Sequence, residues 1–132
     1  MKVFVDTSAL ISLLDRDDGN HARAAKAFEK LRKKDAILVC SNYVLVETCA
    51  IIQHRLGLGA LRSFQKDFFP LLVTVWVDED IHMAATSAVL AAGKRRLSLV
   101  DCSSFEVMRR SGIDRAFTFD RHFQQQGFSC LP

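Results

Sequence analysis

The feature that most constrains this chain is a strand-like run near its start that ends on an acid. Val3–Val5 is β-branched and aromatic, which is typical of a buried strand, and Asp6 ends the run. Thr7 or Ser8 can then cap a helix with an apolar face. Ligands of open parallel sheets bind at the carboxyl ends of the strands. A helix cap is the ordinary role of an acid at this place, so a functional role depends on other acids reaching the same edge.

Strand-like and helical patterns alternate along the rest of the chain. The later strand-like segments are Ala36–Cys40, Leu72–Val77, Ala116–Phe119 and Phe128–Leu131. Strands joined through helices form parallel sheets with right-handed crossovers. We therefore predict an α/β fold, a three-layer α/β/α sandwich around a central parallel sheet of four or five strands in the order 3-2-1-4-5. Its 132 residues fit a single domain covering positions 1–132.

Composition excludes some classes of protein and leaves others open. Hydrophobic residues make up 49% of the chain, enough for a core, and no apolar run approaches the length of a membrane span. We expect no signal peptide, because the first apolar run is broken at once by Asp6. The four cysteines have no metal-binding spacing and suit a reducing, cytoplasmic location. A net charge of +3 is compatible with nucleic-acid binding without indicating it.

Three further acids are predicted to reach the same edge of the sheet as Asp6. Glu47 lies early in a largely apolar helix, Asp101 lies in the first turn of the helix that begins near Leu99, and Asp120 follows a strand directly. Carboxylates about 4 Å apart repel by roughly 4 kcal/mol per pair at an effective dielectric near 20. A cation would relieve this repulsion, and all-oxygen ligation selects Mg²⁺ or Mn²⁺.

Hydroxyl groups near these acids can orient ligands or bound water. The candidates for this supporting role are Thr7, Ser8 and Ser103. Basic residues that could hold a phosphate are Lys94, Arg95, Arg96, Arg121 and His122. The basic residues of the helix from His21 to about Lys34 are interpreted as an ordinary solvated face.

Four short segments, taken in order, closely resemble the PIN-domain ribonucleases, above all the VapC-type toxins of type II toxin–antitoxin systems. The segments are Val5–Leu10 (VDTSAL), Val44–Glu47 (VLVE), Leu97–Cys102 (LSLVDC) and Phe117–Phe123 (FTFDRHF). By this resemblance, the acidic site of the family falls on Asp6, Glu47, Asp101 and Asp120, and the hydroxyl of its first motif falls on Ser8. One departure is Val100, where a Thr often precedes the third acid. We expect it to affect support of the site rather than the metal.

The resemblance implies a metal-dependent endoribonuclease, in which metal-activated water cleaves RNA phosphodiester bonds with Asp6, Glu47, Asp101 and Asp120 as ligands. It also implies a cognate antitoxin protein as partner and a homodimer, with which the apolar segment Phe64–Leu72 is compatible. A short single domain favours a toxin, but a housekeeping role in RNA processing stays open.

Two other classes of protein also gather acids above a parallel sheet. A receiver-like signalling domain needs an acid pair after the first strand and a late Lys, but Asp6 has no acidic neighbour and no Lys follows Lys94. A haloacid-dehalogenase-like phosphatase needs an acid two residues after the first, where Ser8 stands. The sequence therefore favours the nuclease over both.

Overall fold

The computed structural model describes residues 1–132 and contains one five-stranded parallel sheet in the order β3-β2-β1-β4-β5. The strands are β1 Lys2–Val5, β2 Ile37–Ser41, β3 Leu72–Val75, β4 Arg115–Phe117 and β5 Ser129–Leu131. Val3 pairs with Leu38 in parallel register, and Phe4 pairs with Ala116. The predicted sheet, its strand order and its central first strand are confirmed.

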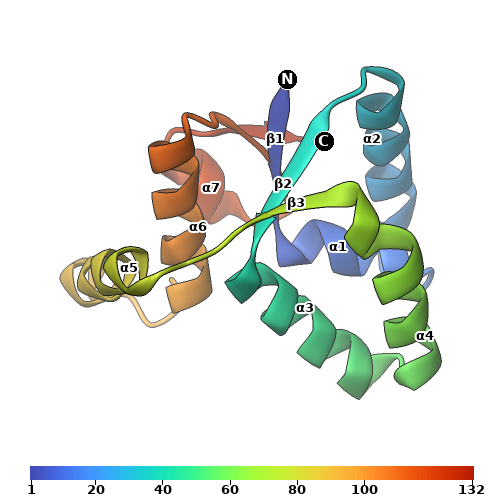
Figure 1. The fold of residues 1–132 in the computed structure, drawn as a ribbon, viewed down its shortest axis with the longest axis horizontal. Helices are drawn as coiled ribbons and strands as arrows, with labels where there is room; N and C mark the ends of the chain where they lie inside the picture. The colour runs from blue at the N-terminus through green and yellow to red at the C-terminus, as the bar shows by residue number, and fades with distance from the viewer.

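Helices cover both faces of the sheet. They are α1 Thr7–Leu14, α2 His21–Lys33, α3 Asn42–Arg55, α4 Leu58–Ser63, α5 Glu79–Ala92, α6 Leu99–Ser111 and α7 Arg121–Gln125. A π-helical turn at Phe64–Phe68 and a 3₁₀ turn at Phe69–Leu71 connect α4 to β3. Figure 1 shows α1, α2 and α4 on one side of the strands and α5, α6 and α7 on the other. None of the helices combines the length and apolar character that crossing a membrane requires.

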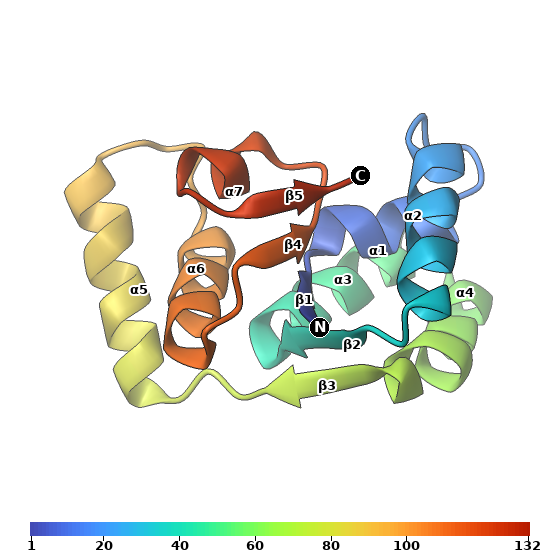
Figure 2. The ribbon, with the colours of Figure 1, turned by 90° about the horizontal axis from the view of Figure 1, so that it is seen from above.

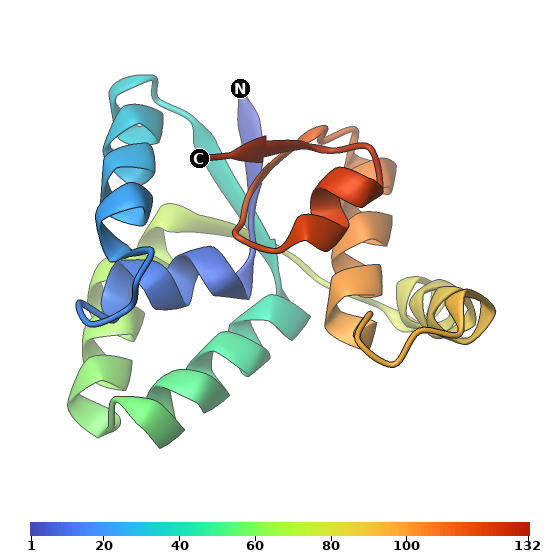
Figure 3. The same ribbon diagram turned by 180° about the vertical axis from the view of Figure 1, so that it is seen from behind.

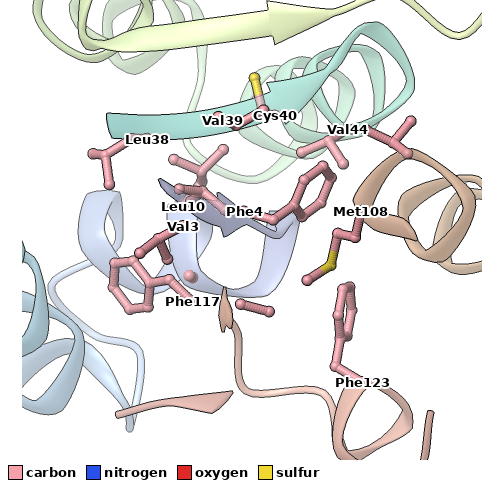
Figure 4. Close-up of a cluster of buried hydrophobic side chains, with 14 of the residues drawn as sticks. Val3, Phe4, Leu10, Leu38, Val39, Cys40, Val44, Met108, Phe117 and Phe123 are labelled. Atoms are coloured by element: carbon pink, nitrogen blue, oxygen red, sulfur yellow. The ribbon is translucent and has the colours of Figure 1, made fainter. Parts of the chain in front are cut away.

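The core is built around β1, the central strand. Figure 4 shows Val3 and Phe4 between β2 on one side and Phe117 of β4 on the other, with Phe4 directed toward Met108 and Phe123. Val3 and Phe4 are fully buried, as the apolar run at the start of the chain predicts. Because β1 is held on both sides, the residue that follows it has a fixed position.

Several predicted boundaries differ from the structure for local reasons. Asp6, rather than Thr7 or Ser8, is the N-cap of α1, and its side chain accepts a hydrogen bond from Ser8 N. The third strand ends at Val75 instead of Val77, because Val77 N donates to Asn42 Oδ1 at 2.6 Å rather than to a neighbouring strand. The fourth strand ends at Phe117, and the two residues after it enter the site.

Candidate active site

A cleft of about 370 Å³ opens at the carboxyl ends of the strands and brings all four predicted acids together. The starts of α1, α3 and α7 meet at this end of the sheet (Figure 3). The charged residues lining the cleft are Asp6, Asp18, Glu47, Asp101, Asp120 and Arg55. Five acids against one cation make this a strongly negative cleft, as the sequence predicts for a cation site.

Asp6 is fixed by hydroxyl groups from two elements. Its N–H donates to Phe117 O at 3.0 Å, which extends the pairing of β1 with β4 into the site. Its Oδ2 accepts from Ser8 Oγ at 2.8 Å and from Thr118 Oγ1 at 3.1 Å. Burial raises the pKa of the Asp6 carboxyl, and the nearby Asp120 charge raises it further against these hydrogen bonds.

Ser8 and Thr118 also fix the segment that carries Asp120. Ser8 Oγ accepts from Phe119 N at 2.9 Å, and Thr118 Oγ1 accepts from Asp120 N at 2.9 Å. The two hydroxyl oxygens lie 3.2 Å apart. Two side chains that are 110 positions apart in sequence thus lock the first and the last acid into one unit.

Thr7 and Glu47 position the cleft from the α3 side. Thr7 Oγ1 donates to Val44 O at 3.5 Å and accepts from Thr48 Oγ1 at 3.2 Å, which ties α1 to α3. Glu47 is half-buried one helical turn after Val44 and lines the cleft. It makes no hydrogen bond or ion pair with the protein, so both of its carboxylate oxygens are available to a ligand.

Asp101 is held by a capping box at the start of α6. Ser98 Oγ accepts from Asp101 N at 3.0 Å, and Asp101 Oδ2 accepts from Ser98 N at 3.3 Å. Asp101 is only 9% exposed. Burial, followed by the charges of Asp120 and Asp6, raises the pKa of the Asp101 carboxyl to about 6. The protein therefore holds this carboxylate where its negative charge is disfavoured unless a cation is bound.

His122 lies against two of the acids. Its Nδ1 is 2.9 Å from Asp120 Oδ1 and 3.9 Å from Asp101 Oδ2. The first contact lacks the direction of a hydrogen bond, so the buried Nδ1 has no hydrogen-bond partner. Donor atoms of His122, Asp101 and Asp120 lie within 4.8 Å of one another, close enough to share one ion. The sequence suggested His122 as a phosphate contact, and the structure places it among the acids.

The donor set fits a hard divalent cation. Asp6 and Asp101 each use Oδ2 for hydrogen bonds, and Asp120 uses Oδ1 to accept from His122 N at 2.9 Å. Each aspartate therefore keeps its second oxygen free of protein donors, as Glu47 keeps both. Oxygen ligands of this kind suit Mg²⁺ or Mn²⁺.

Other residues proposed for the site lie outside the cleft. Ser103 is buried, and its Oγ donates to Val100 O at 2.7 Å, within its own helix. Lys94, Arg95 and Arg96 are exposed in the loop before α6 and do not line the cleft, and neither does the exposed Arg121. The hydroxyl of Ser103 thus bonds to the backbone of its own helix. A sequence pattern does not show which acceptor a helical serine takes.

Sequence reasoning missed four residues that the cleft uses. Ser98 could have been found, because Ser98 and Asp101 have the spacing of a capping box. Thr118 precedes Asp120 by two residues, which is a weak signal at the end of a strand. Asp18 and Arg55 reach the cleft from the loop before α2 and from the end of α3, and no local pattern predicts this.

Comparisons with known proteins identify the family of this chain. The family model of the PIN domain matches residues 3–129. The protein named 23S rRNA-specific endonuclease VapC20, from Mycobacterium tuberculosis, is 32% identical over 127 residues, which cover 96% of this chain and 95% of that protein. The same protein appears in two strains of that species.

Solved structures share the whole fold. The crystal structure of Mycobacterium tuberculosis VapC20, described as a sarcin-ricin loop cleaving toxin, superposes with a TM-score of 0.84 at 30% identity and covers 98% of this chain and 99% of its own. Two more distant structures share the fold alone. FitAcB from Neisseria gonorrhoeae has a TM-score of 0.71 at 16% identity, covering 100% of this chain and 97% of its own. VapBC2 from Rickettsia felis has a TM-score of 0.72 at 11% identity, covering 98% and 97%.

Proposed function

Because this chain belongs to the PIN domain family, we propose that it is a divalent-metal-dependent endoribonuclease and the toxin of a toxin–antitoxin pair. The observation that carries the proposal is the meeting of four carboxylates in one cleft, three of them with one oxygen held by the protein and one oxygen free. A structural role needs no such convergence, since each acid could cap its own helix elsewhere. Their mutual repulsion calls for a cation.

Asp6, Glu47, Asp101 and Asp120 would hold Mg²⁺ or Mn²⁺ through the oxygens that no protein group occupies. When bound, such an ion lowers the pKa of water and offsets phosphate charge, which is the chemistry that phosphodiester hydrolysis needs. The raised pKa values of Asp6 and Asp101 support this assignment, because a bound cation would stabilise both carboxylates in their ionised form.

Hydroxyl groups around the cleft hold the acids in fixed positions. Ser8 and Thr118 hold Asp6 and the Asp120 segment together, while the Ser98 cap orients Asp101. Arg55, exposed at the end of α3, is the one cation of the cleft lining and is suited to contact a phosphate oxygen. No serine or cysteine nucleophile is required in this scheme.

The proposed substrate class rests on the similarity of this chain to VapC20. VapC20 is named for the 23S rRNA and its sarcin-ricin loop. Since this chain is 32% identical over 96% of its length and covers almost all of that protein, we propose an exposed loop of large-subunit ribosomal RNA as its substrate. Such a loop offers unpaired nucleotides, which are the usual target of sequence-specific RNA recognition.

An antitoxin partner and a homodimer complete the proposal. An arginine from the antitoxin would be attracted to the five acids and would occupy the cleft by charge-assisted hydrogen bonds. Family resemblance supports the homodimer, and so do exposed apolar side chains after β3 and on α5, including Trp76 at 72% and Leu90 at 76% exposure.

The direct test is cleavage of ribosomal RNA by the purified chain. We expect cleavage of deproteinised or ribosomal 23S rRNA with Mn²⁺ or Mg²⁺ and none in EDTA, and primer extension should map the cut to one loop. The absence of any RNA cleavage with either metal would refute the nuclease. Cleavage at many unrelated positions would instead refute the proposed substrate.

The toxin role has its own test. We expect induced expression of the chain to arrest growth, and expression together with the protein encoded immediately upstream to restore it. A chain that cleaves RNA but leaves growth unaffected would favour a housekeeping role in RNA processing.

A further inference from the structure

We propose that a basic groove along α2 binds the RNA substrate next to the acid cleft by holding its phosphates. This inference rests on the proposed ribonuclease function and names the surface that the function would need. The groove lies between α2 and the end of β5, and Figure 2 shows these two elements facing each other. It is separate from the cleft that holds the four acids.

The charged side chains of the groove are all basic. Its charged side chains are Arg23, Lys26, Lys30, Lys34 and Arg115. All five are exposed, and none of them lies within ion-pair distance of a carboxylate. Because none of these cations has a carboxylate partner, a polyanion can bind them without breaking an ion pair.

The spacing along α2 places four of these cations in one row. Positions 23, 26, 30 and 34 are separated by three or four residues, which puts them on one helix face over about 16 Å at 1.5 Å per residue. Like charges at this spacing oppose helix formation, so folding does not explain the row. A nucleic-acid strand carries one phosphate per about 3.4 Å of helix axis, so a row of this length can meet several phosphates.

The rest of α2 provides a contrast. The acid of the helix, Glu29, forms an i,i+4 ion pair with Lys33 at 3.2 Å, and the Arg32 guanidinium lies over the Phe28 ring at 5.9 Å. Arg32 and Lys33 line no part of the groove. The basic face that the sequence suggested was merely solvated is therefore two surfaces, one that contains an ion pair and one whose cations have no carboxylate partner.

The groove starts where the acid cleft ends. The Arg23 guanidinium lies over the Phe119 ring at 5.5 Å, and Phe119 lines the cleft between Thr118 and Asp120. Asn20, which immediately precedes α2, also lines the cleft. Because the cleft itself repels phosphates before a cation binds, a row of cations at its border supplies the attraction that brings RNA to it.

The test is RNA binding in EDTA, where no cleavage occurs, measured by fluorescence anisotropy over a range of salt concentrations. In the groove variant, Lys26→Gln with Lys30→Gln, we expect the slope of log affinity against log salt to be shallower by about 1.4, since each lost single-strand phosphate contact removes about 0.7. The control variant, Arg32→Gln with Lys33→Gln, makes the same charge change on the same helix and should keep the slope of the wild type.

Three results would overturn the groove. One is an equal loss in both variants, which would show only a general effect of net charge. Another is no change in the groove variant together with a shallower slope after Lys94→Gln, Arg95→Gln and Arg96→Gln, which would move the RNA surface to the loop before α6. The third is unchanged RNA binding but lost binding of the upstream partner, which would make the groove a docking surface for an acidic protein segment.

Kinetics separate a failure of the groove from a failure of the proposed function. With Mn²⁺, we expect the groove variant to raise KM for a ribosomal RNA fragment about tenfold and to leave kcat unchanged. If the wild type cleaves RNA and the groove variant has the same KM and the same salt slope as the wild type, only the groove is refuted. A wild type that cleaves nothing refutes the proposed function, and the binding measurement in EDTA still decides on the groove.

Discussion

At the scale of single residues, the site is organised by hydroxyl groups that hold one oxygen of a carboxylate and leave the other free. Thr118 is the clearest case, because its Oγ1 donates to Asp6 Oδ2 and accepts from Asp120 N. Ser8 makes the equivalent contacts to Asp6 and Phe119 N. A ligand set prepared in this way loses little freedom when an ion binds.

Thr118→Val tests this support. The valine keeps the shape of the side chain but leaves Asp120 N without its acceptor and Asp6 without one donor. We expect about 2 kcal/mol lower free energy of unfolding and a 10- to 100-fold loss of metal affinity or cleavage. Chemical denaturation and cleavage assays measure the two effects. Thr118→Ser keeps the hydroxyl and should be close to the wild type; if it is as impaired as the valine variant, the hydroxyl is not what matters.

Asp101 predicts a pH dependence of stability in the absence of metal. Its pKa is about 6 in the folded protein and near 3.8 when unfolded, so between these values the folded state binds more protons. The free energy of unfolding therefore falls as pH rises through this window, and the penalty is complete above pH 6. The raised pKa of Asp6 acts in the same direction.

We expect the Tm in EDTA to be higher at pH 5 than at pH 7, and this difference to shrink in Asp101→Asn. Differential scanning calorimetry at both pH values measures it. An identical pH dependence in the variant and the wild type would assign the effect to other groups.

At the scale of elements, the start of α6 combines a helix cap with a ligand. The Ser98 side chain caps Asp101 N, while the Asp101 carboxylate returns to Ser98 N. The cap of α5 is a matched control outside the cleft, since Asp78 Oδ1 accepts from Ile81 N at 2.9 Å.

Ser98→Ala should lower the free energy of unfolding by about 1 kcal/mol, the usual cost of losing a cap, and Asp78→Ala should cost about the same. Only Ser98→Ala should also weaken Mn²⁺ binding, because losing the contact from Asp101 N to Ser98 Oγ loosens the first turn of α6, which positions the Asp101 carboxylate. Titration of the Mn²⁺ dependence of cleavage distinguishes the two. Equal Mn²⁺ dependence in both variants would show that Ser98 only caps the helix and does not support metal binding.

Elements also show how far the sequence can predict this protein. The parallel sheet and its order follow from apolar runs such as Val3–Val5 that alternate with helical patterns. The four acids follow from their places directly after strands or in the early turns of helices. Thr118 and Ser8 could not be paired in advance, because their contact spans 110 positions and depends on how β1 and β4 align. Ser103 was misjudged for the converse reason, since its hydroxyl finds a closer acceptor in its own helix.

At the scale of the whole molecule, charge of opposite sign lies on two adjoining surfaces. The acid cleft attracts cations and repels RNA, whereas the groove along α2 attracts RNA, and Phe119 and Arg23 mark the border between them. A net charge of +3 conceals this separation. Composition alone could therefore not indicate where a polyanion binds.

The exposed apolar residues predict a homodimer. The segment Phe64–Leu72, which the sequence offered as an apolar surplus, is partly used in the core, since Phe64 is fully buried and stacks on Phe68. Trp76, Met83 and Leu90 are exposed instead. Multi-angle light scattering of the isolated chain at micromolar concentration should give twice 14.8 kDa, about 30 kDa. A mass of one chain would contradict the homodimer.

The central claim is that the four carboxylates exist to hold a divalent cation, and Asp101→Asn tests it most directly. Asparagine can still accept the hydrogen bond from Ser98 N, but it removes one negative charge and one strong ligand. The measurement is RNA cleavage with Mn²⁺ by wild type and variant, together with the Tm of each in EDTA and with Mn²⁺. We predict a loss of cleavage of at least about 100-fold, an equal or higher Tm in EDTA because repulsion from Asp6 and Asp120 is relieved, and a smaller rise in Tm on adding Mn²⁺. Full cleavage by the variant, with the same Mn²⁺-dependent rise in Tm as the wild type, would contradict the claim.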